Sequence, residues 1–205
     1  MQKYFNSRLP AITIALFIMG VIGQTIWLYK HMVELAGEYY QAARDSYVAL
    51  YDLERIEKLA IDMETGLRGY LLTGDPAFLK PYNEARQEMQ GYYEKLYEIL
   101  GPDAASLASL ESINYEIQNW ISTFAEPSIA RRKLLGQDTT LKNLTAGIDL
   151  SRSKTIMDHI RNDFDRADKN HEVYRSKQIQ DILALHRRLT FQSLGGTGVL
   201  LLVIF

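Results

Sequence analysis

Glu64 and Arg68 are spaced to form an ion pair, since residues at i and i+4 meet on one face of a helix. An exposed pair of this kind is worth only about 0.3 kcal/mol. Asp158 and Arg161 carry the same charges further along the chain. If a helical bundle buries these groups together, removing one partner costs several kcal/mol. The four residues therefore indicate either a buried structural cluster or a ligand-binding cluster.

Other reactive residue types do not assemble into a catalytic pattern. A zinc protease motif at His171-Glu172 would need a second histidine at position 175, where Arg175 stands. The chain has no cysteine, which excludes disulfides, thiolate zinc sites and thiol nucleophiles. The glycine-rich segment 195–198 lies in an apolar stretch without a lysine, so it is not a phosphate loop. We expect no catalytic residue, metal site or cofactor in this region.

Two stretches without a charged residue, 9–29 and 189–205, bracket the segment 30–188. A run of about 20 apolar residues crosses a bilayer as a helix. We predict transmembrane helices at 9–29 and, continuing beyond the given sequence, at 189–205. A cleaved signal peptide and a buried core helix are the alternatives, but the first stretch is too long for a signal peptide and lacks its cleavage site.

The basic residues near the spans set the predicted orientation. Lys3 and Arg8 place the tail of residues 1–8 in the cytoplasm, whereas Arg187 and Arg188 before the second span argue the other way. Because the first helix usually dominates, we expect a two-pass protein of the inner membrane with a periplasmic or extracellular segment 30–188. That segment holds all 25 acidic residues and 21 of the 23 basic ones, which argues against nucleic-acid binding.

Helical periodicity dominates the segment between the spans. Apolar residues recur every three or four positions, and the first row ends at Thr73-Gly74-Asp75-Pro76. There Gly74 can take a left-handed cap, Asp75 can cap the next helix and Pro76 can occupy its first position. The residues predicted to form the first core row are Leu53, Ile56, Ala60, Met63, Leu67 and Leu71.

Three more helices follow from the same periodicity. The break at Gly101-Pro102-Asp103 repeats the first corner, and Pro127 should kink the third helix or start a new turn. Asp138 is a candidate cap for the fourth helix, after a loose start through Gly147. The predicted row of the second helix comprises Phe78, Tyr82, Ala85, Met89, Tyr92, Leu96 and Ile99. The predicted row of the fourth helix comprises Ile156, Ile160, Phe164, Ala167, His171, Tyr174, Gln178, Ile182, Leu185 and Leu189, in which His171 and Gln178 are polar interruptions.

Four helices joined by short corners predict an all-α, up-and-down four-helix bundle, with two long helices continuing into the membrane. Because the bundle has an even number of helices, the chain ends on the side where it began, which two spans in one membrane require. The first and fourth helices outlast the other two, so a helix pair would be left near the membrane. Such a pair buries little apolar surface alone, and we therefore predict a parallel homodimer. Tyr40, Tyr47 and Tyr51 share one helical face. This row indicates either packing in the core or in the dimer interface, or a solvated aromatic pocket.

The segment 62–75, DMETGLRGYLLTGD, followed by Phe78-Leu79 and Tyr82, resembles the signature of the third class of CHASE domains. Trp120 with Glu126-Pro127, and the segment 154–161, are similar to later parts of that family in the expected order. The resemblance covers roughly residues 35–185. The candidate sensor residues it marks are Asp62, Glu64, Thr65, Gly66, Arg68, Gly69, Tyr70, Trp120, Asp158 and Arg161.

The resemblance implies an extracellular sensory module of a bacterial transmembrane receptor. Its cytoplasmic output, in the same chain, would be a histidine kinase, a nucleotide cyclase or a chemotaxis-type signalling region. The stimulus would be a small molecule or a protein that the resemblance does not identify. A structural membrane tether without a ligand is the alternative.

Overall fold

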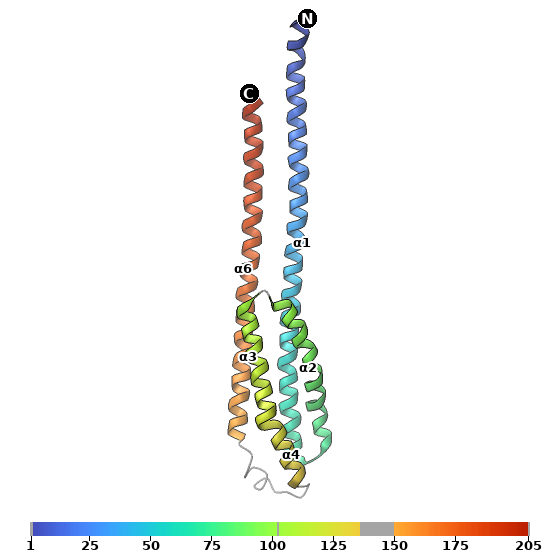
Figure 1. The fold of residues 1–205 in the computed structure, drawn as a ribbon, viewed down its shortest axis with the longest axis vertical. Helices are drawn as coiled ribbons and strands as arrows, with labels where there is room; N and C mark the ends of the chain where they lie inside the picture. Colours follow the sequence, from blue (N-terminus) through green and yellow to red (C-terminus); the bar gives the residue numbers. More distant parts are fainter. Residues whose placement is uncertain (1, 102, 136–149, 205) are drawn as a thin grey trace. The chain divides into compact units, whose positions relative to one another are not determined.

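The computed structural model describes the backbone of residues 2–101, 103–135 and 150–204, and almost all described residues are helical (Figure 1). The chain divides into two compact units. Unit 1 comprises Met1–Arg44 and Arg175–Phe205, and unit 2 comprises Asp45–Tyr174. Two long helices, α1 (Gln2–Thr73) and α6 (Leu150–Ile204), contribute residues to both units.

Unit 2 is a four-helix bundle, as predicted. The lower part of α1 is followed by a 3₁₀ turn, η1 (Pro76–Phe78), and by α2 (Leu79–Leu100). The third rod of the bundle is a continuous run of α3 (Ala104–Trp120), the π-helical turn η2 (Ile121–Ala125) and α4 (Glu126–Leu135). The first part of α6 completes the bundle, and the described residues contain no strand.

The corner between α1 and α2 has the predicted chemistry. Gly74 has a positive φ of 73°, and its N–H donates to the Tyr70 carbonyl at 2.8 Å. Asp75 accepts a hydrogen bond from the Ala77 N–H at 2.9 Å, with Pro76 at the first position of η1. A left-handed residue of this kind favours glycine, because a Cβ is strained there.

The corner between α2 and α3 was predicted to repeat the corner between α1 and α2, but the structure shows a difference. Gly101 has φ −49°, so the helix ends without a left-handed residue. Asp103 does cap α3, since its carboxylate accepts from the N–H groups of Ala105 and Ser106. The two corners thus share a capping aspartate but not the glycine conformation.

Pro127 lies at the start of a new helical segment, which is one of the two outcomes predicted for it. The residue lies at the second position of α4, directly after the π turn of Ile121–Ala125. Proline offers no N–H to the carbonyl one turn earlier, which weakens the α-helical hydrogen bonding just before it. A π turn inserts one extra residue at such a place. The predicted fourth-helix start at Asp138 and Gly147 lies outside the described residues.

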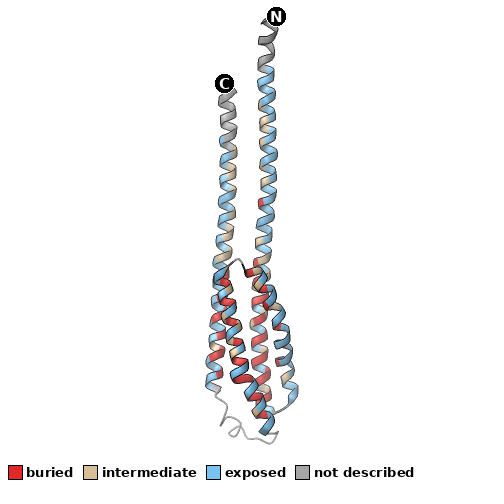
Figure 2. Cartoon of the chain, viewed as in Figure 1, coloured by how far each residue is buried: buried red, intermediate tan, exposed pale blue. Residues whose placement is uncertain are grey.

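The core of unit 2 follows the predicted rows in large part (Figure 2), but predicted Phe78 is exposed and predicted Ile99 is only partly buried. Every residue of the first row is buried, and Met63 and Ile56 are completely inaccessible. On α2 the buried residues after Met89 are Tyr93, Leu96 and Leu100, so the core row passes through Tyr93 rather than Tyr92. The α6 row is buried from Ile156 to His171. Beyond His171 the predicted row is only partly buried, and its member Leu185 is exposed.

Unit 1 contains the first part of α1 and the last part of α6. Among the described residues, α1 is the helix with a stretch apolar enough to cross a membrane, with a mean hydropathy of 2.0 and none of that stretch buried. Gln24 of α1 donates to the Oγ of Ser193 of α6 at 3.1 Å and also to its carbonyl oxygen. The predicted second span lies largely where side chains are not described.

Candidate sensory site

Glu64, the centre of the predicted cluster, is a carboxylate on α1 whose side chain is only 7 % exposed. Arg161 of α6 donates from Nη2 to Glu64 Oε2 at 3.1 Å and from Nη1 to Asp158 Oδ1 at 2.9 Å. Arg68 Nη2 lies 2.6 Å from Glu64 Oε1, in ion-pair contact without hydrogen-bond alignment. The structure therefore brings Glu64, Arg68, Asp158 and Arg161 into one network, which joins α1 to α6.

The partners of Glu64 are far more exposed than Glu64 itself. The side chain of Arg68 is 65 % exposed and that of Arg161 is 46 % exposed. A buried carboxylate between two cations that reach solvent is stabilised by both charges, while the arginines retain part of their hydration. The network can therefore hold two helices together. The solvent-exposed N–H groups of its two arginines can still donate hydrogen bonds to an anionic group.

Gly66 and Gly69, also in the predicted cluster, lie against the start of the second helix. A Cβ on Gly66 would stand 2.7 Å from the backbone oxygen of Phe78 and 3.2 Å from the Tyr82 nitrogen. A Cβ on Gly69 would stand 2.3 Å from the Phe78 ring. These glycines therefore allow the chain after the corner to pack directly on the backbone of α1.

The other predicted site residues do not join the ion-pair network. Tyr70 and Trp120 are core residues, 4 % and 2 % exposed. Trp120 stacks on Phe124 and donates from Nε1 to Ser153 Oγ at 3.1 Å, which links α3 to α6. Thr65 is exposed and Asp62 is half-buried.

Arg132 is a buried residue that sequence reasoning missed. It is 3 % exposed, and its Nη2 would stand 2.6 Å from a Cβ on Gly74. The guanidinium group therefore lies at the carboxyl end of α1, where a positive charge complements the helix dipole. In the sequence, Arg131-Arg132-Lys133 gives no sign of which member is buried.

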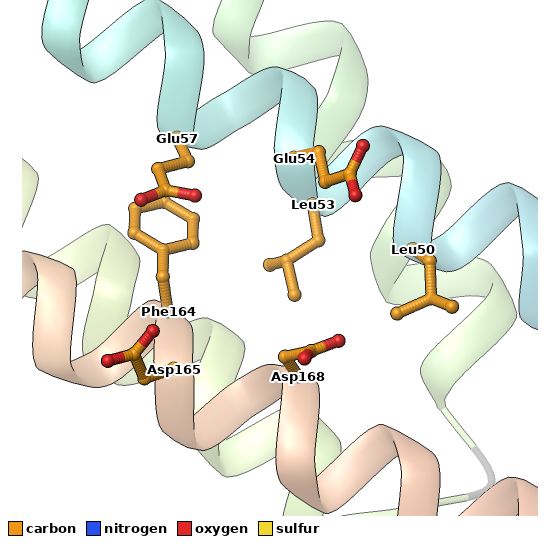
Figure 3. Close-up of a pocket in the computed structure, with 7 residues that line it drawn as sticks. All are labelled: Leu50, Leu53, Glu54, Glu57, Phe164, Asp165 and Asp168. Carbon is orange, nitrogen blue, oxygen red and sulfur yellow. The ribbon is translucent and has the colours of Figure 1, made fainter.

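A groove of about 160 Å³ between α1 and α6 was also missed (Figure 3). Its floor is apolar and its sides carry four carboxylates, two from each helix. The sequence signal was present as two acidic pairs, each spaced by three residues. The lining residues are Leu50, Leu53, Glu54 and Glu57 from α1 and Phe164, Asp165 and Asp168 from α6.

The groove concentrates negative charge. Burial raises the pKa of Glu57, and the charges of Asp165 and Glu54 raise it further, while Arg161 opposes them. Like charges held close together favour protonation or the approach of a cation. An apolar floor beneath such carboxylates suits a cation with an apolar body.

His171 and Asp52 are among the further polar residues buried in unit 2. His171 is 5 % exposed, and its Nε2 lies 2.9 Å from Ser46 Oγ and 3.2 Å from the Ser46 carbonyl oxygen. Asp52 is 3 % exposed, and burial raises the pKa of its carboxyl against the opposing charge of Lys95. The predicted polar interruption at His171 is thus a buried contact between α6 and α1.

Comparison with known families identifies the module. The family model of the CHASE3 domain matches residues 39–181, and the chain belongs to this family. No curated protein and no solved structure gave a match. CHASE3 domains are extracellular sensory domains of signalling receptors, so this region is sensory and not enzymatic. The described side chains contain no group of three or more residues suited to holding a metal ion.

Proposed function

We propose that residues 1–205 are the sensory input and transmembrane region of a bacterial receptor with two membrane spans. Unit 2 would lie in the periplasm or outside the cell, and the cytoplasmic output would be a histidine kinase, a nucleotide cyclase or a chemotaxis-type region. The observation that carries this proposal is the continuity of α1 and α6. Each is a single helix that contains both a terminal apolar stretch and part of the CHASE3 bundle.

Continuous helices provide a simple route for a signal. A stimulus that binds two packings of unit 2 with different affinity shifts the balance between them. A small displacement of α6 relative to α1 would then be carried along both helices to the output. Two of the contacts between α1 and α6 in unit 2 are polar: Glu64 with Arg161 and Ser46 with His171. When the helices move, water can replace either partner of such a contact.

The first test is the placement of unit 2. Because the chain has no cysteine, single cysteines can be introduced at Gly91, which faces open space, and at Lys3. A membrane-impermeant maleimide added to intact cells should label the cysteine at position 91 and spare the one at position 3. The reverse pattern would contradict the proposed topology.

The second test addresses the helix displacement. A disulfide between Gln24→Cys and Ser193→Cys would fix α1 against α6, because these side chains touch. In the full-length receptor, this disulfide should freeze the output activity in one state, and reduction should restore the wild-type level. The single variant Gln24→Cys is the control for loss of the amide. Output unaffected by the disulfide would favour the alternative, a structural tether.

A further inference from the structure

The two charge-free stretches end at the same level of unit 1. Gln24 of α1 donates to Ser193 of α6 at 3.1 Å, and the two helices run in opposite directions (Figure 1). Lys30 lies six residues after Gln24 on α1, and Arg187 lies six residues before Ser193 on α6. At 1.5 Å per residue, both lie about 9 Å from that contact along the helix axes. Lys30 and Arg187 are therefore level with each other, just beyond the two apolar stretches.

Lys30, Arg187 and Arg188 form what we call the cationic collar. All three side chains are exposed. Their charged groups form no ion pair with any side chain that the structure describes. Because neighbouring residues of a helix are turned by about 100°, Arg187 and Arg188 point to different sides of α6. The collar therefore presents cations around the helix pair rather than on one face of it.

Acidic residues do not neutralise the collar. The segments 30–34 and 182–188 contain one acidic residue, Glu34. Its carboxylate lies 3.0 Å from Nδ1 of His31, a neighbour on α1. This level of unit 1 thus has three permanent positive charges against one negative charge.

Aromatic residues mark the same level as the boundary of a bilayer. Trp27 and Tyr29 end the first apolar stretch and are 42 % and 70 % exposed. Tryptophan and tyrosine concentrate where the hydrocarbon meets the headgroups. A lysine or arginine at this boundary can extend its charged group into the headgroup layer while its methylene groups stay on apolar surface. The collar is therefore placed to meet the phosphate groups of lipids.

The collar opposes the usual distribution of charge across a membrane. Lysine and arginine favour the cytoplasmic side, whereas the proposed topology puts Lys30, Arg187 and Arg188 on the outer side. No ion pair among the described residues compensates for this placement. Arginine binds phosphate through two parallel N–H···O bonds, which gives this contact geometry as well as charge. A phosphate-bearing partner at the membrane surface would account for the two adjacent arginines.

We propose that the cationic collar binds the phosphate groups of anionic phospholipids in the leaflet at this end of the two spans. A zwitterionic lipid carries the same phosphate, but its own cation competes with the collar. Each lysine or arginine near an anionic surface adds to the attraction, which falls off within a Debye length of about 8 Å. The inference rests on the proposed function only in placing the two apolar stretches in a bilayer.

The test uses the fluorescence of Trp27, which lies three residues before Lys30. The full-length receptor is reconstituted in phosphatidylcholine vesicles that contain a fixed fraction of a lipid with brominated acyl chains, either phosphatidylglycerol or phosphatidylcholine. The difference between the wild type and Trp27→Phe isolates the signal of Trp27. Brominated phosphatidylglycerol should quench this signal several-fold more strongly than brominated phosphatidylcholine. Equal quenching by the two lipids would overturn the proposal.

Paired variants test whether the collar causes this preference. Arg187→Gln combined with Arg188→Gln should remove most of it, whereas Arg187→Lys combined with Arg188→Lys should keep most of it. The matched control is Arg175→Gln combined with Lys177→Gln. Lys177 lies ten residues from Arg187, about 15 Å along α6, which exceeds the Debye length. An equal loss in the control pair, or no loss in the glutamine pair, would contradict the role of the collar.

Inorganic phosphate separates a lipid headgroup from a soluble phosphate as the ligand. Added inorganic phosphate should reduce the preference no more than sodium chloride of the same ionic strength does, and a larger reduction would overturn lipid as the ligand. Both leaflets of the vesicles have the same composition, so the result does not depend on orientation. Maleimide labelling at position 91 therefore tests the proposed topology separately. External labelling without a lipid preference rejects the collar alone, and a lipid preference with reversed labelling rejects the topology alone.

Discussion

Two pairs of helical glycines, one in each unit, have opposite surroundings. In unit 2, Gly66 and Gly69 are in contact with the start of the second helix, and a Cβ at either position would collide with it. In unit 1, Gly23 and Gly37 face open space. Unit 2 thus completes its packing within one chain, while the free face of α1 in unit 1 does not. The predictions that follow test this difference, beginning with the largest effect.

Gly66→Val should destabilise unit 2 by about 3 kcal/mol, the upper end of the usual cost of overpacking. The added side chain collides with the backbone of Phe78, which cannot move away as a flexible side chain would. Thermal unfolding should be followed by the fluorescence of buried Trp120, in a Trp27→Phe background that removes the other tryptophan. Gly91→Ala is the matched control, because a Cβ there meets nothing, and it should stabilise α2 by up to about 1 kcal/mol.

Glu64→Ala should cost about 2 kcal/mol of unfolding free energy. The change removes a buried carboxylate from two cations, but both arginines reach solvent and recover part of their hydration. Glu84→Ala, which removes an exposed carboxylate 3.8 Å from Lys80, should cost far less. Equal costs for the two variants in denaturant titrations would show that Glu64 does not hold α1 to α6.

Glu57→Gln should stabilise unit 2 at neutral pH by about 0.5 kcal/mol, the size of one like-charge contact. The folded state raises the pKa of Glu57, so folded protein binds the proton more tightly than unfolded protein. Wild-type stability therefore falls as pH rises through the interval between the ordinary pKa and the raised one. The gain from the variant should grow from about pH 4 to pH 7 and shrink in high salt. A gain independent of pH would contradict the raised pKa.

Gly37→Ala should leave the unfolding of unit 2 unchanged, because the new methyl group touches nothing within the chain. A shift in the Trp120 unfolding midpoint would show that position 37 affects the folding of unit 2.

Most of the fold of unit 2 was predictable, because periodicity and capping act locally. The corner at Thr73–Pro76 was predicted residue by residue, and so was the core row of α1. The meeting of Glu64 with Arg161 was foreseen as one possible cluster, although a sensory role for it remains a prediction. The expectation that Tyr40, Tyr47 and Tyr51 could lie in the core of the chain was wrong, since all three are largely exposed.

Apart from that cluster, features that depend on contact between distant segments were not predictable. The groove requires the acidic pairs of α1 and α6 to lie at the same level along the bundle axis. Local sequence does not determine this register between the two helices. The burial of Arg132, with charged neighbours on both sides, follows from where α4 meets Gly74.

The π turn at Ile121–Ala125 has a consequence for the helix that follows it. Each residue added to a helix turns everything after it by about 100°. Glu126 accepts hydrogen bonds from Tyr82 and Arg86, and Arg132 lies against Gly74. Removing a single residue from Ile121–Ala125 would rotate both groups out of phase with these partners. The extra residue of the π turn sets the rotation of α4 about its own axis. That rotation places Glu126 and Arg132 against the corner between α1 and α2, which the family signature forms.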